Sequence, residues 1–432
     1  MSKRIRQDSA HDRPASELRP LYRRVPWTPL AISIIVVLSS AFAVSPIRDA
    51  ASLADVSEAY LLRPLGYVVL APMSDVLDTL TLLSARQHVA LLLAVVVCFT
   101  LWRVARATRA SATRRQHLLA TAALVVAIVL VYAAAAVLPR PMAALVSDNA
   151  DIARIDFHSH TSASHDGRPG WSAESNRAWH RDGGYDVAYI TDHGTVAAAE
   201  RGMVQNPSPA GEGVILLQGI EVTWTGEHVA ILSAERRYRG ILTENLRDVD
   251  EQSLRLASLI SGREPVVIWN HPHQLTRLPV ASGPGTPGVR GIEVSNGAPD
   301  SRDEVGRRRA AIVALAEKKN LTMTGGSDNH GWGSTAPNWT LMLIFGWRGM
   351  SPDSLASTID DVVRKGGFGG TRVVERRVAD GTTNLALAFT LFSAPARMLT
   401  TLSNDERTSW LIWIWLITAT AWWLHRRRAP AA

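Results

Sequence analysis

Long runs without a charged residue near both ends of the chain limit its possible folds more than any other feature. The two longest, Trp27 to Val44 and His117 to Leu138, contain no Asp, Glu, Lys or Arg. At 1.5 Å per residue, a helix over either run can cross a hydrocarbon layer of about 30 Å. The sequence therefore predicts a protein attached to a membrane by helices.

Two further uncharged runs are shorter. Gln87 to Trp102 is bordered by Arg86 and Arg103, whose side chains can reach toward lipid headgroups. Thr408 to Leu424 has tryptophans near both ends, as interfacial anchors have. We predict transmembrane helices at 27–44, 87–102, 117–138 and 408–424.

Two other apolar segments are interrupted by charge or proline. Asn384 to Leu402 contains Pro395 and Arg397, so we expect 377–407 to be an amphipathic segment lying on the membrane surface. Tyr60 to Ala85 contains one arginine and two aspartates, and we expect the same of it.

Basic residues beside the predicted spans set the orientation. The segment 1–24 carries seven Lys/Arg, 103–115 carries five arginines, and 425–428 carries three. Four crossings place these segments together on the cytoplasmic side of a cell (inner or plasma) membrane and put 139–407 on the other side. Ala41 to Ala43 also resembles a signal-peptide cleavage site, so a cleaved first run is the alternative.

The net charge of +7 belongs to those cytoplasmic segments. They hold 15 of the 46 basic and 3 of the 39 acidic residues, which leaves 31 basic against 36 acidic residues elsewhere. The positive charge is therefore no argument for nucleic-acid binding.

The middle of the chain has a different pattern. From Ile152 to about Val374, short β-type runs alternate with helical patterns, which predicts an α/β layer or barrel with a mainly parallel sheet. The predicted strands are 153–158, 187–191, 214–222, 228–233, 265–269, 291–294, 321–325 and 339–345, and the predicted helices are 172–182, 250–261, 301–319 and 352–365.

The distribution of histidine indicates a metal site. Cys98 is the only cysteine, so a cysteine-based zinc site is excluded and any metal must be held by His and carboxylate. Nine of the thirteen histidines lie within 158–330, most of them where a predicted strand ends. His158 and His160 are at i and i+2, on one face of a strand, so both can reach one ion. Because strand ends of a barrel share one face, the remaining groups can converge there.

Five motifs in order carry a resemblance to a known family: DFHSHTSASHDG, ITDHGT, GIEVTW followed by GEHVAIL, WNHPH, and GGSDNHG. They resemble the motifs of the PHP (polymerase and histidinol phosphatase) superfamily and cover about half of the chain. The resemblance implies a distorted (β/α)7 barrel, here flanked by transmembrane α-helices, with two to three divalent metal ions that hydrolyse phosphoesters. The predicted organisation is a basic tail at 1–26, a membrane region at 27–146, a PHP phosphoesterase domain at 147–376, the interfacial segment at 377–407, the last span at 408–424 and a basic tail at 425–432.

The resemblance also implies which side chains hold the metals. Glu221 would bridge the first two sites, and Glu221, His193 and Asp328 are the residues we expect to be catalytic. In the third site the usual Ser-Asp-Gly appears as Ser-His-Asp-Gly, so either His165 or Asp166 is the ligand, with Asp166 slightly favoured by its place before the glycine. By site, the implied ligands are His158, His160, Glu221 and Asp328; Glu221, His228 and His271; and His193 and His330 with His165 or Asp166.

The chemistry of the donors leaves the metal open. Imidazole and carboxylate suit Zn²⁺, Mn²⁺ and Fe²⁺ alike. Clustered divalent ions lower the pKa of a bound water and supply positive charge to phosphoryl oxygens, which phosphoester hydrolysis needs. We expect Asp156 and Asp192 to orient ligand imidazoles, and His180 to be a surface residue.

The expected activity is hydrolysis of a small extracytoplasmic phosphoester, such as a nucleotide or a sugar phosphate. The acidic balance of that region disfavours a long nucleic acid without excluding one. The alternatives are a 5′–3′ exonuclease or nucleoside bisphosphate phosphatase, and a metal-binding sensory or scaffolding domain without turnover. The sequence leaves the oligomeric state open.

Overall fold

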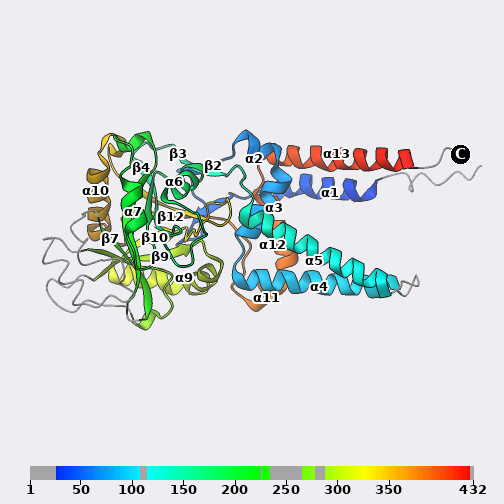
Figure 1. Ribbon diagram of the computed structural model, residues 1–432, viewed down its shortest axis with the longest axis horizontal. Helices are drawn as coiled ribbons and strands as arrows, with labels where there is room; N and C mark the ends of the chain where they lie inside the picture. The colour runs from blue at the N-terminus through cyan, green and yellow to red at the C-terminus, as the bar shows by residue number, and fades with distance from the viewer. Residues whose placement is uncertain (1–25, 108–113, 225, 234–264, 278–287, 429–432) are drawn as a thin grey trace, which may run out of the picture.

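The computed structural model describes residues 26–107, 114–224, 226–233, 265–277 and 288–428. An α/β domain forms one end of the molecule, and long helices extend from it in one direction (Figure 1). The predicted helix 250–261 lies outside the described residues.

A ten-stranded sheet forms the centre of the α/β domain. Each predicted strand is present, with ends that differ by a few residues. In spatial order the strands are β1 (Ile47–Asp49), β12 (Arg372–Arg376), β11 (Asn338–Leu343), β4 (Ile152–Ser159), β5 (Val187–Ile190), β6 (Ile215–Trp224), β7 (Glu227–Ser233), β8 (Val266–Trp269), β9 (Val289–Asn296) and β10 (Thr322–Gly326).

The sheet is mixed, whereas the sequence predicted a mainly parallel one. Among the described strands, four neighbouring pairs are parallel and five are antiparallel. β6 ends at Trp224 and β7 begins at Glu227, which leaves no room for the crossover that parallel strands need. Proximity in sequence therefore makes this pair an antiparallel hairpin.

The sheet curls because the loop after β10 lies along the end of β4. The backbone N–H of His160 donates to the carbonyl of Asn329 at 3.0 Å, and that of Asp328 donates to the carbonyl of His158 at 2.8 Å. Ser159 and Asn329 form a parallel bridge there. The result is a curled half-barrel of ten strands in place of the seven-fold barrel that the family resemblance implied.

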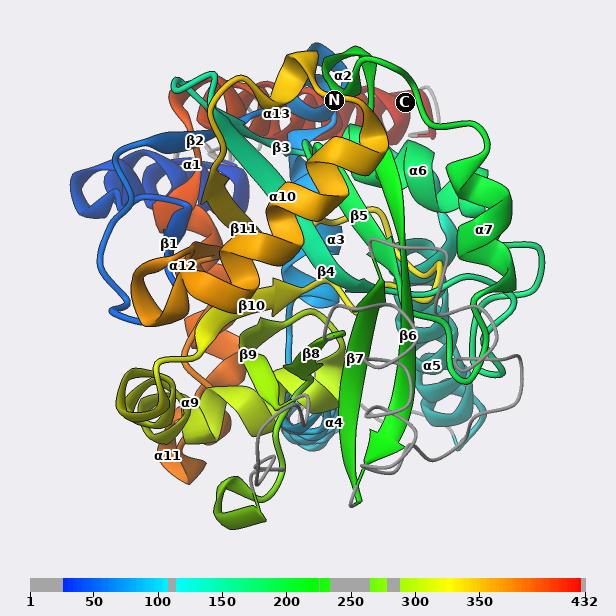
Figure 2. The ribbon, with the colours of Figure 1, turned by 90° about the vertical axis from the view of Figure 1, so that its left-hand side faces the viewer.

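Helices surround this half-barrel (Figure 2). The strands β5 and β8 are buried along their whole length, as expected of strands covered on both faces. Side-chain caps begin two of the helices: the Oγ of Ser172 accepts from the N–H of Ser175, and that of Ser351 accepts from the N–H of Ser354. The covering helices are α6 (Ala173–Asp182), α7 (Ala197–Met203), α9 (Pro299–Lys319) and α10 (Pro352–Lys365).

Residues before the predicted domain boundary at 147 also contribute to its sheets. β1 pairs antiparallel with β12, so that Ile47 faces Arg376. A separate two-stranded sheet joins β2 (Ala59–Leu62) to β3 (Ala144–Ser147). The segment between the first two long helices is therefore partly folded onto the α/β domain.

The helical part has two layers (Figure 1). Helices of 5 to 12 residues, called short below, lie next to the α/β domain, and helices of 12 to 25 residues, called long, extend beyond them. Among the described residues, two stretches are long and apolar enough to cross a membrane by length and composition, Ala85–Arg106 and Arg115–Val137, and Trp27–Phe42 is a shorter apolar helix. The short helices are α2 (Leu65–Val69), α3 (Ala71–Thr81), α11 (Asn384–Ala388) and α12 (Thr390–Thr401), and the longer ones are α1 (Trp27–Leu38), α4 (Ala85–Ala107), α5 (Arg114–Val137) and α13 (Asn404–Arg428).

A buried ionic network connects the short helices to the sheet. Asp78 of α3 accepts from Arg140 at 2.6 Å and from Arg376 of β12 at 3.2 Å. The hydroxyls of Tyr67 and Thr335 donate to the same carboxylate at 2.9 and 2.8 Å. Because a buried charge is costly unless it is paired, this network fixes α3 against the domain.

We predict that Asp78→Ala lowers the free energy of unfolding by about 3–5 kcal/mol, because two buried guanidinium groups lose their carboxylate. Thermal unfolding of the full chain in detergent measures this. The control is Asp182→Ala, which removes an exposed ion pair with Arg181 and should change stability by less than about 1 kcal/mol. Equal stability of the two variants would contradict the role of the network.

Candidate metal centre

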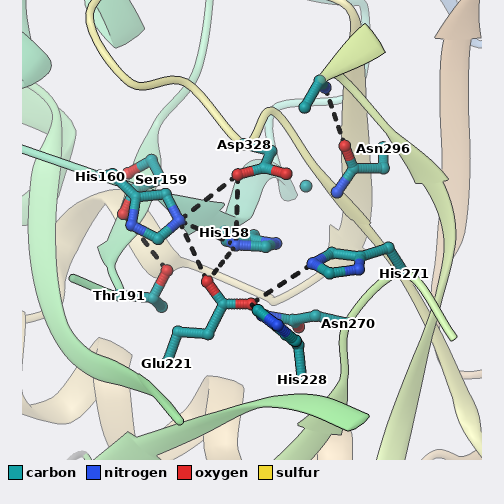
Figure 3. A network of polar contacts seen from close by, with 12 residues as sticks. His158, Ser159, His160, Thr191, Glu221, His228, Asn270, His271, Asn296 and Asp328 are labelled. Carbon is teal, nitrogen blue, oxygen red and sulfur yellow. Dashed lines mark hydrogen bonds and ion pairs between the residues drawn. The ribbon is translucent and has the colours of Figure 1, made fainter. Parts of the chain in front are cut away.

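Side chains from neighbouring segments of the sheet meet where β4 and β10 come together (Figure 3). Sequence reasoning placed these residues at strand ends, and the structure brings them to one place. His158 comes from β4 and His160 from just after it, His193 follows β5, Glu221 lies in β6, His228 lies in β7, His271 follows β8, and Asp328 and His330 follow β10.

Glu221 is at the centre of this group. Its side chain is 2% exposed, and each of its two oxygens faces its own set of imidazoles. Such an arrangement lets one carboxylate bridge two cations. Oε2 lies 3.0, 3.2 and 3.6 Å from the Nε2 atoms of His158, His160 and His193, and Oε1 lies 3.2 Å from Nδ1 of His228 and 3.5 Å from Nε2 of His271.

Asp328 completes the buried side of the centre. Its Oδ1 lies 3.5 Å from Nε2 of His158 and 3.4 Å from Nε2 of His160. The backbone of Asp328 has φ of 50°, a conformation uncommon outside glycine that is found at functional sites. Two imidazoles and two carboxylates thus point their donor atoms at one place.

A third group of donors is more open to solvent. Oδ2 of Asp166 lies 3.2 Å from Nε2 of His330 and 3.5 Å from Nε2 of His193. His165 is exposed, and its ring centre lies 5.0 Å from that of His193. Of the two residues that the sequence left open, Asp166 is therefore the one in position to hold an ion with His193 and His330.

These donors fit divalent metal ions. The Nε2 atoms of His158 and His160 lie 3.0 Å apart, and both face Oε2 of Glu221 and Oδ1 of Asp328, an arrangement that suits ligands of one cation. Imidazole with carboxylate is a donor set for Zn²⁺ and similar ions. Three overlapping groups have ligand atoms within 4.8 Å of one another: His158, His160 and Glu221; His193, Glu221 and His228; and His160, Asp166, His193 and His330.

Sequence reasoning missed Glu293, a buried carboxylate of β9. Its Oε1 lies 3.3 Å from Nδ1 of His158, and its Oε2 accepts from the N–H of His271 at 2.7 Å. Glu293 therefore holds two candidate ligands in place from behind. Gly326 permits the contact, because a Cβ there would collide with Glu293 and His158. The available signal was an acidic residue between the apolar Ile292 and Val294, within a predicted strand.

His180 is buried, so the prediction of a surface position was wrong. Its Nε2 lies 2.8 Å from Oδ2 of Asp156. Oδ1 of Asp156 accepts from the N–H of His158 at 3.1 Å and from that of Ser327 at 2.9 Å. Asp156 thus joins the ends of β4 and β10 through their backbones, whereas we had expected it to orient a ligand imidazole.

Asp192 likewise contacts backbone and hydroxyl groups. It accepts from the N–H of Thr161 at 2.6 Å and from its hydroxyl at 2.8 Å. Burial raises the pKa of the Asp192 carboxyl despite these bonds. It fixes the loop after β4, and so acts on His160 through the chain.

The charges of the centre are coupled. Burial alone would lower the pKa of His160, but Asp328 and Glu221 outweigh it and raise that pKa to about 9. The same competition raises the pKa of His158, with Glu221 as its main partner. Burial of Glu221 and Asp328 is outweighed by His158, and the pKa of each carboxyl lies below its usual range. In the absence of metal, protons on imidazoles therefore supply the positive charge.

No protein-family model matches this chain, and no curated protein does. Among solved structures it is similar to a two-domain protein from Bacteroides vulgatus containing a predicted PHP-like metal-dependent phosphoesterase, with 17% identity, a TM-score of 0.33, and coverage of 56% of this chain and 70% of that one. It is also similar to PsfC from Pseudomonas syringae, with 18% identity, a TM-score of 0.33, and coverage of 50% of this chain and 99% of that one. A third similar structure is a lesion-specific endonuclease from Pyrococcus furiosus, with 12% identity, a TM-score of 0.33, and coverage of 51% of this chain and 57% of that one.

Two of these three are named for the chemistry that the motifs indicate, cleavage of phosphoesters.

We predict that metal binding to the apo protein releases protons at pH 7, because His160, whose pKa is about 9, must lose its proton to become a ligand. Calorimetric titration with Mn²⁺ in buffers of different ionisation enthalpy measures the number of protons released per ion bound. The apparent affinity should rise up to about tenfold per pH unit between pH 7 and 8.5 for each proton released. Heats independent of the buffer would contradict this.

Proposed function

We propose that this chain is a metal-dependent phosphoesterase of the PHP type, anchored in a membrane, with its metal centre on the extracytoplasmic side. The observation that carries the enzymatic part is the position of Glu221, whose two oxygens face separate groups of imidazoles. A carboxylate placed in this way suits two adjacent ions, and adjacent ions are typical of centres that cleave phosphoesters.

The candidate ligands form three sets, each placed to hold one divalent ion. Ions held by these sets would lower the pKa of a bound water and offset the charge of a phosphoryl group. Glu221 and Glu293 keep the imidazoles in fixed directions, because both are buried and contact more than one ligand segment. The proposed ligands are His158, His160, Glu221 and Asp328; Glu221, His228 and His271; and Asp166, His193 and His330.

The exposure of the donors supports entry of a substrate from one side of the centre. The side chains of His158 and His160 are at most 1% exposed, whereas those of His228 and Asp166 are 37% and 41% exposed. One side of the centre is closed by protein and the other is open. An open side favours turnover over a sensory or scaffolding role, because a purely structural site is usually closed.

A nucleic-acid substrate is the second candidate. Trp332 is 49% exposed near His330, and the guanidinium of Arg168 lies 5.5 Å from the centre of its ring. An exposed indole beside a cation can stack a base. The surplus of acidic residues outside the three basic segments favours a small substrate.

Exposed apolar side chains support the membrane anchor. Each of the four long helices bears them, for example Ile35 (54% exposed), Leu93 (61%), Leu130 (64%) and Ile417 (62%). Contiguous apolar surface on this scale is unusual in a protein surrounded by water. The helices extend from the same side of the domain (Figure 1), so a single bilayer can cover all of them.

The ends of these helices support the orientation. The N-terminal ends of α1 and α5 and the C-terminal ends of α4 and α13 lie at the end of the molecule away from the α/β domain (Figure 1). Near these ends, Arg106 lies over Trp102 and Arg427 over Trp423. Cations beside tryptophans are typical of a membrane interface, and basic residues favour its cytoplasmic side.

We predict that the purified full chain contains two to three divalent ions and that Glu221→Gln and His193→Ala each lower phosphoesterase activity at least about 100-fold. Elemental analysis measures the metal. Activity is measured on p-nitrophenyl phosphate, bis(p-nitrophenyl) phosphate, mononucleotides, sugar phosphates and oligonucleotides. The control is His117→Ala, on α5 beside Arg103, which should keep both metal and activity.

Less than one ion per chain after expression in metal-replete medium would contradict the proposal. If the protein cleaves oligonucleotides faster than every small ester, a nucleic acid becomes the preferred substrate.

We predict opposite labelling of two single cysteines in a Cys98→Ala background. In intact spheroplasts, a membrane-impermeant maleimide should label Asp353→Cys, on the exposed start of α10, and should label Arg427→Cys only after lysis. The expectation follows from the positions of these residues at opposite ends of the molecule. The reverse pattern would overturn the orientation and leave the metal centre unaffected.

A further inference from the structure

A cavity of about 450 Å³ connects the metal centre to the helical part. Asp328 and His330 line it from the metal centre. Leu80 of α3 and Tyr132 and Ala136 of α5 line it from the helices. A cavity of this volume is within the range of small-molecule sites, and this one joins the proposed site of chemistry to the proposed membrane region.

The wall on the helix side offers few polar groups. Leu80, Leu82 and Ala136 present carbon atoms. The polar side chains on this side already have partners: the hydroxyl of Thr81 donates to the carbonyl of Leu77 at 2.8 Å, and Nδ1 of His88 lies 3.0 Å from the hydroxyl of Tyr132. A sugar or nucleoside would leave its hydroxyls without partners against such a wall, which is costly. A hydrocarbon chain has no hydroxyl groups, so it can lie against this wall without that cost.

Arg302 of α9 adds a positive charge to the wall. Its Nη2 donates to the carbonyl of Gly297 at 3.0 Å, and its buried Nη1 has no hydrogen-bond partner among the described residues. Nε of Arg302 also donates to the carbonyl of Asn296 at 3.4 Å, and no ion pair joins Arg302 to a carboxylate among the described residues. A half-buried guanidinium without a carboxylate beside it favours an anionic ligand, and arginine is well suited to phosphate.

The cavity lies where the helices leave the domain. His88 is near the start of α4, and Ala136 is near the end of α5. In the proposed orientation this is the level of the extracytoplasmic headgroups. A lipid could therefore place its phosphate near the metal centre while its chains stay close to the bilayer.

We propose that the substrate is a membrane lipid that carries a phosphoester, with its headgroup at the metal centre and the first part of its hydrocarbon in this cavity. This inference rests on the proposed phosphoesterase function and replaces the nucleotide or sugar phosphate by a lipid. In the reaction, the oxygen of water bonds to phosphorus, the bond from phosphorus to the leaving alcohol oxygen breaks, and that oxygen takes up a proton.

Matched substrates test the preference on the full chain in detergent. Dioctanoyl phosphatidic acid is compared with glycerol 3-phosphate for monoester cleavage, and dioctanoyl phosphatidylglycerol with glycerophosphoglycerol for diester cleavage. For the pair that is cleaved, kcat/KM should be at least tenfold higher for the lipid. Equal or faster turnover of the water-soluble partner would overturn the proposal.

Filling the cavity tests its role. Ala136→Phe should lower the ratio of kcat/KM for the lipid to kcat/KM for bis(p-nitrophenyl) phosphate at least tenfold, because the added ring occupies the space of the hydrocarbon. The control is Ala123→Phe on the exposed surface of α5, which should leave this ratio unchanged. An unchanged ratio in Ala136→Phe would overturn the proposal.

A binding measurement separates this proposal from the phosphoesterase function. Native mass spectrometry of the metal-free full chain with dioctanoyl phosphatidic acid should show one retained lipid, reduced at least tenfold in Ala136→Phe and in Arg302→Gln but not in Ala123→Phe. If neither p-nitrophenyl ester is hydrolysed, the phosphoesterase function fails, and retention of the lipid still decides whether the cavity binds it. Equal retention by all variants would refute the cavity as the site.

Discussion

The buried carboxylate of Glu221, in contact with five imidazoles, is the constraint on which the rest of the centre depends. A charge without water is stable only beside opposite charge. Five segments of the sheet must therefore bring their side chains to one place. The backbone bonds between the loop after β10 and the end of β4 make this possible, because they curl the sheet. The curl of the half-barrel and the ligand geometry therefore have the same cause.

The helical part and the α/β domain form one functional unit in this account. Asp78 joins α3 to Arg140 and to Arg376 of the sheet, so the helices hold a fixed position relative to the metal centre. The cavity between them has carbon-rich walls on the helix side and candidate metal ligands on the other. If the helices served only as a tether, neither a buried network nor a shared cavity would be required.

Much of the α/β domain could be predicted because its strands are short apolar runs and its ligands follow them in recognisable motifs. Contacts between segments that are distant in the sequence could not be predicted. β1 is a very short strand, Ile47–Asp49, and only its pairing with β12 makes it one. Glu293 belongs to no motif, and its role depends on His158, 135 positions away. His180 lies on a helix rich in polar residues, and burial against Asp156 was not visible in that pattern.

The central claim is that Glu221 bridges metal ions held by imidazoles from separate strands. Anomalous diffraction from crystals of the full chain grown with Mn²⁺ tests it directly. The account predicts at least two peaks, each at roughly 2.0–2.2 Å from one oxygen of Glu221, one beside His158 and His160 and the other beside His228 and His271. A single peak that contacts neither oxygen of Glu221, or no peak in this centre, would contradict it.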